Sequence, residues 1–401
     1  MRRSSGLLAF LILAFPLFAE RIRVVVAYDD AQIALAEVPD GTRWGDSAVF
    51  SVEIERDQLE RLRRNPRVRA VDLDEGGHGG LAQSIPIVGA DVLRARGIDG
   101  RGRTIAVLDT GIDSDHPDFG GRIIAEQCFC NNFDGTGCCP GGAIERSGAG
   151  SAEDDHGHGT HVAGIAAGNG PAPGVAPAAW IVAVKVMDAQ NRFRGFQQIH
   201  DALQWIADTR PDVDAINMSL GSFARYEPSQ CNGNAVAIGL QPVIARLRAR
   251  GVLIAACSGN DGDTKGMWLP ACMDAVVSVG ATYDVAGSYG PADTVVPFTN
   301  SSAGLDLLAP GADITSSRRG GGWVSFSGTS MATPHVAGTI LLIRQIMGHA
   351  TADAVQELMQ RTGKPVVDKR NGLTIPRLDA LAAVDAAPRE PVPPRRRTAR
   401  H

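Results

Sequence analysis

Residues 104–109, TIAVLD, form a continuous apolar run that ends in an aspartate. A strand without a polar face suits the interior of a parallel sheet that is covered on both sides. Strand and helix patterns alternate through the rest of the chain, which predicts an α/β protein with a parallel β-sheet and helices on both faces. Further strands are expected at 181–186, 215–218, 252–256 and 275–279, and helices at 161–168, 199–206, 236–247, 330–346 and from 352 onward.

The composition restricts the class of protein. The 401 residues include 39 basic and 44 acidic side chains, a formal net charge of −5, which gives no reason to expect a nucleic-acid partner. A hydrophobic content of 44% with 21% charged residues is ordinary for a globular protein and excludes a wholly disordered chain. Disorder is expected at the basic, proline-rich tail, residues 388–401 (PREPVPPRRRTARH).

The N-terminus has the pattern of a secretory signal peptide over residues 1–19. Arg2 and Arg3 precede an apolar run at 6–18, and the small residue Ala19 follows it. This pattern predicts export to the extracellular space or the periplasm. The apolar run is shorter than the roughly 20 residues that a membrane-spanning helix needs, so a stable membrane anchor is the weaker alternative.

Residues 20–80 have the pattern of a separate, small α+β domain. Strands are expected at 21–28, 48–54 and 68–73, with a helix at 57–66 and a glycine-rich joint at 76–80. A unit of this size buries too little apolar surface to be very stable alone. It should therefore depend on the larger domain, which is expected over residues 81–387.

Seven cysteines lie in the larger domain. Export permits disulfides, and an odd number leaves at least one thiol unpaired or joined to another molecule. Four cysteines lie close together in CFCNNFDGTGCC: Cys128, Cys130, Cys138 and Cys139. We expect a surface loop closed by two disulfides, for which three connectivities are open. Zinc binding is the alternative, although this spacing lacks the usual C-x₂-C pairs.

Three polar segments are expected at strand ends or helix starts, the edge where open parallel sheets bind ligands. Asp109 ends the first strand, histidines lie in 155–164 (DHGHGTHVAG), and Ser330 begins a helix within 327–338 (SGTSMATPHVAG). Alone, each has a simpler explanation, namely a turn aspartate, a metal site or a helix N-cap. The histidine spacing lacks the glutamate of an H-E-x-x-H zinc site. Taken together, the three side chains predict catalysis by a serine nucleophile.

The segments DTGIDSDHPDF (109–119), HGTHVAG (158–164) and GTSMATPHVAG (328–338) resemble the three signature segments of the subtilisin-like serine proteases. They also stand in that family's order, aspartate, histidine and serine. The resemblance covers about residues 85–383. The serine does not lie in a G-x-S-x-G motif, which argues against an α/β-hydrolase.

The resemblance implies a serine endopeptidase whose catalytic triad is Asp109, His158 and Ser330. His158 would take the serine proton as the nucleophile attacks, and Asp109 would orient the imidazole. The segment 252–260 (VLIAACSGN) is similar to the family segment that supplies the oxyanion-hole amide, which implies this role for Asn260. No cofactor is implied for catalysis.

The resemblance also implies the substrate-binding residues. They are Ser219, Leu220 and Gly221 on one wall of the first side-chain pocket and Cys257, Ser258 and Gly259 on the opposite wall. Small residues on these walls imply room for a sizeable apolar side chain, and hence a loose hydrophobic preference. A disulfide between Cys231 and Cys272 is implied nearby, which leaves Cys257 as the free thiol.

Residues 20–80 resemble the family's propeptide, above all at 59–75 (LERLRRNPRVRAVDLDE). This implies a zymogen whose propeptide assists folding, inhibits the enzyme intramolecularly and is removed by self-cleavage near 76–81. Protein or peptide substrates are the other expected partners, and the enzyme is expected to be a monomer. The alternative is a catalytically silent binding scaffold on the same fold, although all four catalytic positions carry competent residues.

A structural calcium ion stays an open expectation. The family's usual calcium loop follows the HGTH helix, and here that stretch is only 169–174 (NGPAPG). Asp118 remains as a possible carboxylate ligand. His161, a turn beyond His158 on the same helix, is expected to be structural.

Overall fold

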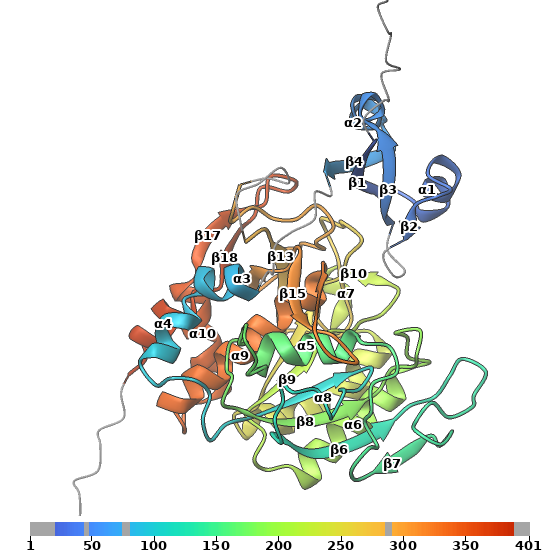
Figure 1. Ribbon diagram of the computed structural model, residues 1–401. Coiled ribbons are helices and arrows are strands. Elements are labelled where there is room, and N and C mark those ends of the chain that lie inside the picture. The colour runs from blue at the N-terminus through green and yellow to red at the C-terminus, as the bar shows by residue number, and fades with distance from the viewer. Residues whose placement is uncertain (1–20, 44–47, 74–80, 285–290, 389–401) are drawn as a thin grey trace, which may run out of the picture.

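The computed structural model describes residues 21–43, 48–73, 81–284 and 291–388. The expected signal peptide, the glycine-rich joint at 76–80 and all but the first residue of the basic tail lie outside these ranges. A small N-terminal unit sits on one end of a larger α/β unit (Figure 1). Within the described residues, no helix is both long and apolar enough to cross a membrane.

The small unit is a four-stranded antiparallel sheet of order β2-β3-β1-β4. Its elements are β1 (Arg21–Tyr28), α1 (Ala31–Glu37), β2 (Thr42–Arg43), β3 (Val49–Glu55), the 3₁₀ helix η1 (Arg56–Gln58), α2 (Leu59–Arg64) and β4 (Val68–Leu73). The three predicted strands and the predicted helical region are confirmed. Helix α1 and the edge strand β2 are additional, because elements of seven and two residues are too short to show a periodic pattern.

The larger unit is built on a ten-stranded sheet of order β17-β18-β14-β13-β11-β9-β5-β8-β6-β7. The strands are β5 (Thr104–Asp109), β6 (Ile123–Phe129), β7 (Glu145–Ser147), β8 (Trp180–Lys185), β9 (Ala215–Met218), β11 (Leu253–Cys257), β13 (Val277–Thr282), β14 (Leu307–Pro310), β17 (Lys364–Val367) and β18 (Thr374–Arg377). The strands from β18 to β6 are parallel, as predicted. The outermost strands β7 and β17 pair antiparallel, so the sheet is mixed at its edges.

Helices cover both faces of this sheet, as the sequence predicts (Figure 1). The helices are α3 (Leu81–Val88), α4 (Ala90–Ala95), α5 (His158–Ala167), α6 (Phe196–Thr209), α7 (Pro228–Cys231), α8 (Ala235–Ala249), α9 (Thr329–Ile346), α10 (Ala352–Thr362) and α11 (Ala380–Asp385). Side chains of β5 alternate between the two faces: Ile105 and Val107 pack with α5 and α9, whereas Ala106 and Leu108 pack with α6 and α8. The continuous apolar run at 104–108 thus supplies two cores at once.

The described cysteines form three disulfides. Within the four-cysteine loop, Cys128 pairs with Cys139 and Cys130 with Cys138. This result selects one of the three open connectivities and leaves none of the four as a zinc ligand. The third disulfide joins Cys231 to Cys272, and Cys257 is a buried free thiol, so both of these predictions are confirmed.

Two short antiparallel strand pairs lie outside the two main sheets. They are β10 (Arg225–Tyr226) with β12 (Met267–Trp268), and β15 (Ile314–Ser317) with β16 (Trp323–Phe326). The first pair lies beside the loops that follow β9 and β11. The second packs against α5.

Candidate active site

The end of β5 and the start of α5 bring the predicted aspartate and histidine together. Asp109 is fully buried, and its Oδ1 atom lies 2.7 Å from His158 Nδ1. The same oxygen accepts the backbone N–H of Thr110 at 2.7 Å. A carboxylate in this place fixes the imidazole and selects the tautomer that carries its proton on Nδ1.

Glycine at position 159 allows this close approach. A Cβ atom on Gly159 would lie 2.0 Å from the carbonyl oxygen of Gly111 and 3.0 Å from Asp109 Cβ. Real Cβ atoms do not occupy such positions, so any side chain here would push α5 away from the end of β5. The glycine after His158 is therefore a packing requirement of this contact.

Asp154 is a functional residue that sequence reasoning missed. Its Oδ1 accepts the Thr110 hydroxyl at 2.8 Å, and its Oδ2 accepts the N–H and the hydroxyl of Thr160 at 3.0 and 2.5 Å. Burial raises the pKa of Asp154, but its hydrogen bonds outweigh burial and hold that pKa below the usual value. This ionised carboxylate ties the loop that carries Asp109 to the helix that carries His158.

His158 is held in a state suited to a general base. Burial lowers its pKa, but the charge of Asp109 and the hydrogen bond to it outweigh burial and raise the pKa above 6.5. The neighbouring His156 has no such partner, and burial together with the charge of His158 lowers its pKa. The electrostatics thus distinguish His158 from the other histidine of the same loop.

Ser330 is the second residue of α9, where the positive end of the helix dipole and free backbone N–H groups favour negative charge. Gly328 is the N-cap residue, so the explanation of Ser330 as a simple cap is wrong. Ser219, which follows β9, fixes the backbone here because its hydroxyl donates to the Ser330 carbonyl oxygen at 2.8 Å. The Ser330 hydroxyl donates to the Ser219 carbonyl oxygen at a longer 3.4 Å.

Asn260 lies in the loop after β11 with its amide turned toward the start of α9. Its Oδ1 accepts both the N–H and the hydroxyl of Thr329 at 2.9 Å, which leaves the Nδ2 hydrogens as donors. A point at the Cβ position of Gly328 would lie 3.5 Å from Asn260 Nδ2 and 3.7 Å from Ser330 N. The same point lies 3.7 Å from Asn260 Oδ1, so the whole amide group borders Gly328 together with the Ser330 backbone nitrogen. The expectation that Asn260 is an oxyanion-hole donor stays a prediction.

The two predicted pocket walls are adjacent, because β9 and β11 are neighbouring parallel strands. The expectation of room for a large apolar side chain between them stays a prediction. The indole of Trp268 lies there, and a Cβ on either Gly221 or Gly259 would fall within 3 Å of its atoms. The glycines on the walls thus accommodate a tryptophan of this chain.

Cys257 and His161 are structural. Burial raises the pKa of Cys257 to about 12, and its thiol donates to the Leu220 carbonyl oxygen at 3.5 Å, so it is not a reactive thiolate. His161 Nε2 hydrogen-bonds the Val324 carbonyl oxygen at 2.9 Å, its ring stacks on Phe326, and burial lowers its pKa to about 3. The interpretation of His161 as structural is consistent with these contacts.

A metal site is not supported by the described residues. Among them, no group of three or more histidine, cysteine, aspartate or glutamate side chains is arranged to hold an ion. Asp118 Oδ2 accepts the Ser317 hydroxyl at 2.7 Å and the Trp323 indole N–H at 3.2 Å. These two hydrogen bonds account for one oxygen of the Asp118 carboxylate, and the open expectation of a calcium ion stays untested.

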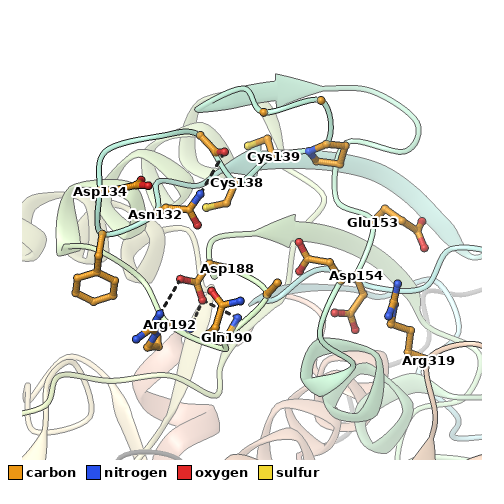
Figure 2. Close-up of a pocket in the computed structure, with 17 residues that line it drawn as sticks. Asn132, Asp134, Cys138, Cys139, Glu153, Asp154, Asp188, Gln190, Arg192 and Arg319 are labelled. Atoms are coloured by element: carbon orange, nitrogen blue, oxygen red, sulfur yellow. Dashed lines mark hydrogen bonds and ion pairs between the residues drawn. The ribbon is translucent and has the colours of Figure 1, made fainter.

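The four-cysteine loop forms one side of a cleft of about 800 Å³ that adjoins the site (Figure 2). Residues 188–192 lie across from it, and Glu153, Asp154 and Arg319 line the end away from Asn132 (Figure 2). Arg192 lies over the ring of Phe133, 5.1 Å from its centroid, and links the two sides. Asp154 therefore lines this cleft and also holds Thr110 and Thr160 next to Asp109 and His158.

The carboxyl edge of the parallel sheet carries the Asp109–His158 pair at the start of α5, and α9, which packs against α5, carries Ser330 in its first turn. The Ser330 hydroxyl itself is hydrogen-bonded to Ser219. An aspartate, a histidine and a serine on one sheet edge are typical of serine hydrolases. The sequence model of the subtilase family matches residues 100–378, which is more than half of the chain, and the chain belongs to that family. The protein is a subtilisin-like serine protease.

Similar proteins agree with this membership. The chain is 37% identical over 256 residues to an intracellular serine protease of Paenibacillus polymyxa, covering 62% of this chain and 68% of that protein. It is 35% identical over 304 residues to an alkaline protease of Shouchella clausii, covering 74% of this chain and 69% of that protein. The crystal structure of a cold-adapted subtilisin-like serine proteinase superposes with a TM-score of 0.53 at 29% identity, covering 69% of this chain and 89% of that one.

Proposed function

We propose that this protein is a secreted serine endopeptidase, made as a self-processing zymogen, with Asp109, His158 and Ser330 as its catalytic triad. The observation that carries the proposal is the 2.7 Å contact between Asp109 and His158 at the start of α5, a helix that packs against α9, whose second residue is Ser330. A carboxylate bound to Nδ1 leaves Nε2 as the basic atom of the neutral ring. Secretion is supported by the signal-peptide pattern and by the three disulfides.

The chemistry begins at the Ser330 hydroxyl, which is too weak an acid to attack an amide without a base. His158 takes its proton as Oγ bonds to the substrate carbonyl carbon, and returns the proton to the leaving amine as the C–N bond breaks. Asp109 stabilises the imidazolium formed in between, in keeping with the raised pKa of His158. Water then releases the acyl group by the same route, and Ser330 is restored.

The carbonyl oxygen becomes negative when the serine attacks. The Asn260 amide and the Ser330 backbone N–H hold this oxygen in the tetrahedral intermediate. The Thr329 bonds to Asn260 Oδ1 fix the amide before substrate arrives, so little reorganisation is needed during the reaction.

The unit at residues 21–73 acts as the intramolecular inhibitor. Arg69 of β4 donates to the carbonyl oxygens of Asp261 at 3.1 Å and Gly262 at 2.9 Å, directly after Asn260. Ala27 and Val49 pack into the same apolar cluster as the larger unit. These contacts support a role in which the unit competes with substrate near the oxyanion hole and is then cut away.

The proposal is tested by secretion of wild-type protein and the Ser330→Ala variant from a host that lacks other extracellular proteases. We expect wild type to lose its N-terminal unit and to hydrolyse casein, whereas the variant stays full length without activity. Ser147→Ala, an exposed serine on β7, is the matched control and should behave as wild type. Normal processing of the Ser330→Ala precursor would contradict the proposal.

A further inference from the structure

Trp268 lies between the two chain segments that flank the first side-chain pocket of the proposed protease. A Cβ on Gly221 would lie 2.8 Å from Trp268 Cβ and 2.9 Å from its Cε3. A Cβ on Gly259, on the opposite wall, would lie 2.7 Å from Cδ2 and 2.8 Å from Cε2. The indole is therefore in contact with the backbone of both walls at once.

The backbone at Trp268 is fastened to both walls. Its N–H donates to the Ser258 carbonyl oxygen at 2.9 Å on the β11 side. On the β9 side, Ser222 N–H donates to the Leu269 carbonyl oxygen at 2.8 Å, and Leu269 N–H donates to the Ser222 hydroxyl at 3.0 Å. Residues 268–269 thus close the bottom of the space between the two walls, at the ends of β9 and β11.

The indole itself is also held in place. Its Nε1–H donates to Asp261 Oδ2 at 2.6 Å, and the same oxygen accepts Asn300 Nδ2 at 2.9 Å. Asp261 lies one residue after Asn260, so the far end of the indole reaches the loop that carries the oxyanion donor. To swing away, the ring would have to give up a charge-assisted hydrogen bond as well as its contacts with both glycines.

We propose that Trp268 fills the first side-chain pocket and restricts the residue before the cleaved bond to glycine or alanine. This inference rests on the proposed function and names the substrate class of the same site. A methyl group extends little beyond the substrate backbone, whereas a leucine or phenylalanine side chain needs the space that the indole occupies. The sequence-based expectation of a large apolar residue there is replaced by this proposal.

The test is a series of peptide p-nitroanilides that differ in the residue before the cleaved bond, Ala, Leu or Phe, measured on mature wild type and on Trp268→Ala. We expect wild type to favour alanine over phenylalanine in kcat/KM by about 100-fold, since pockets that lack room for added carbons discriminate on this scale. Trp268→Ala should raise the ratio of kcat/KM for the phenylalanine peptide to that for the alanine peptide at least about tenfold. Trp180→Ala, a half-exposed tryptophan at the other end of the sheet, is the matched control and should keep the wild-type profile.

Wild type that cleaves phenylalanine and alanine peptides equally well would overturn the role of Trp268 and leave the protease function intact. Wild type that cleaves no peptide would instead overturn the proposed function. A second measurement does not depend on the variant folding: the C-terminal residues of fragments from a denatured protein digested by wild type. We expect glycine and alanine to dominate there, and a majority of large residues would overturn the inference.

Discussion

His158 Nδ1 lies 2.7 Å from Asp109 Oδ1, and Asp109 is fully buried at the end of β5. The imidazolium is therefore stabilised in the folded protein, and the pKa of His158 lies above 6.5 despite burial. A raised folded-state pKa adds stability at pH values below the unfolded pKa, and this contribution is lost as the pH rises through the folded pKa. Catalytic activity has the opposite pH dependence: it rises as the pH increases through the pKa of His158, because the base must be neutral to accept a proton.

We therefore predict that kcat/KM falls as the pH drops through a value above 6.5. Asp109→Asn should lower kcat by about 10⁴-fold, because the amide supports the wrong tautomer, and should move the acid limb to lower pH. The measurement is the pH profile of kcat/KM for both proteins. An unchanged acid limb in Asp109→Asn would show that the aspartate does not control the base.

Substitutions of Asn260 can separate its proposed role as a hydrogen-bond donor to the oxyanion from its hydrogen bonds to Thr329. Asn260→Asp keeps oxygens that can accept the Thr329 hydrogen bonds but removes the donor. It should lose about 10²–10³-fold in kcat with little change in KM, the range known for the equivalent donor in subtilisin, and Asn260→Ala should lose a similar amount. Steady-state kinetics at saturating substrate decides the matter. Full activity in Asn260→Asp would exclude an oxyanion role for this side chain.

Two helical glycines provide a matched pair for the packing argument. Gly159→Ala places a Cβ 2.0 Å from the Gly111 carbonyl oxygen, and Gly239→Ala in α8 meets nothing within 4 Å. We predict that Gly159→Ala loses about 1–3 kcal/mol of unfolding free energy and most of its activity. Gly239→Ala should gain about 0.5–1 kcal/mol with unchanged activity. Denaturant unfolding and an activity assay are measured on both variants. Equal unfolding free energies and equal activities would refute the close packing of α5 on β5.

The region expected to be cut, GGHGGL at residues 76–81, contains four glycines. If Trp268 restricts the first pocket, self-cleavage should follow one of these glycines, and N-terminal sequencing of the secreted protein reads the position directly. A mature N-terminus created after His78 or Leu81 would argue against the restricted pocket.

Arg69 should hold the cleaved unit on the enzyme. Arg69→Ala removes two hydrogen bonds to backbone carbonyl oxygens, so the affinity should fall about tenfold or more. Size-exclusion chromatography after processing should show the N-terminal fragment retained by wild type and released by the variant. Arg61→Ala on the exposed face of α2 is the control, and equal retention in all three proteins would contradict this contact.

Much of the central sheet could be predicted from sequence, because strands such as 104–109 and 215–218 are buried on both faces and read as apolar runs. The edge strands β7 and β17 could not, because their residues are mostly exposed and polar or irregular in pattern. Each pairs antiparallel with its sequence neighbour, β7 with β6 and β17 with β18, and these short strands lack the continuous apolar run that marks the central strands.

The candidate site also contains both residues that the sequence predicts and residues that it does not. Asp109, His158 and Ser330 lie in long motifs, and the cysteine pairing implied for Cys231 and Cys272 was found from the same resemblance. Asp154 was missed because nothing local distinguishes it from Asp155 beside it. Trp268 was missed as an occupant of the pocket because only tertiary packing brings β12 between the two walls.

The central claim is that Ser330 is a nucleophile activated by His158, and labelling with a fluorophosphonate tests it most directly. The mature protein is incubated with the reagent, digested and mapped by mass spectrometry, in wild type, Ser330→Ala and His158→Ala. The account predicts one adduct on Ser330 in wild type, none in Ser330→Ala and greatly slowed labelling in His158→Ala. An active, folded wild type with Ser330 unmodified, or an adduct on another serine, would contradict it.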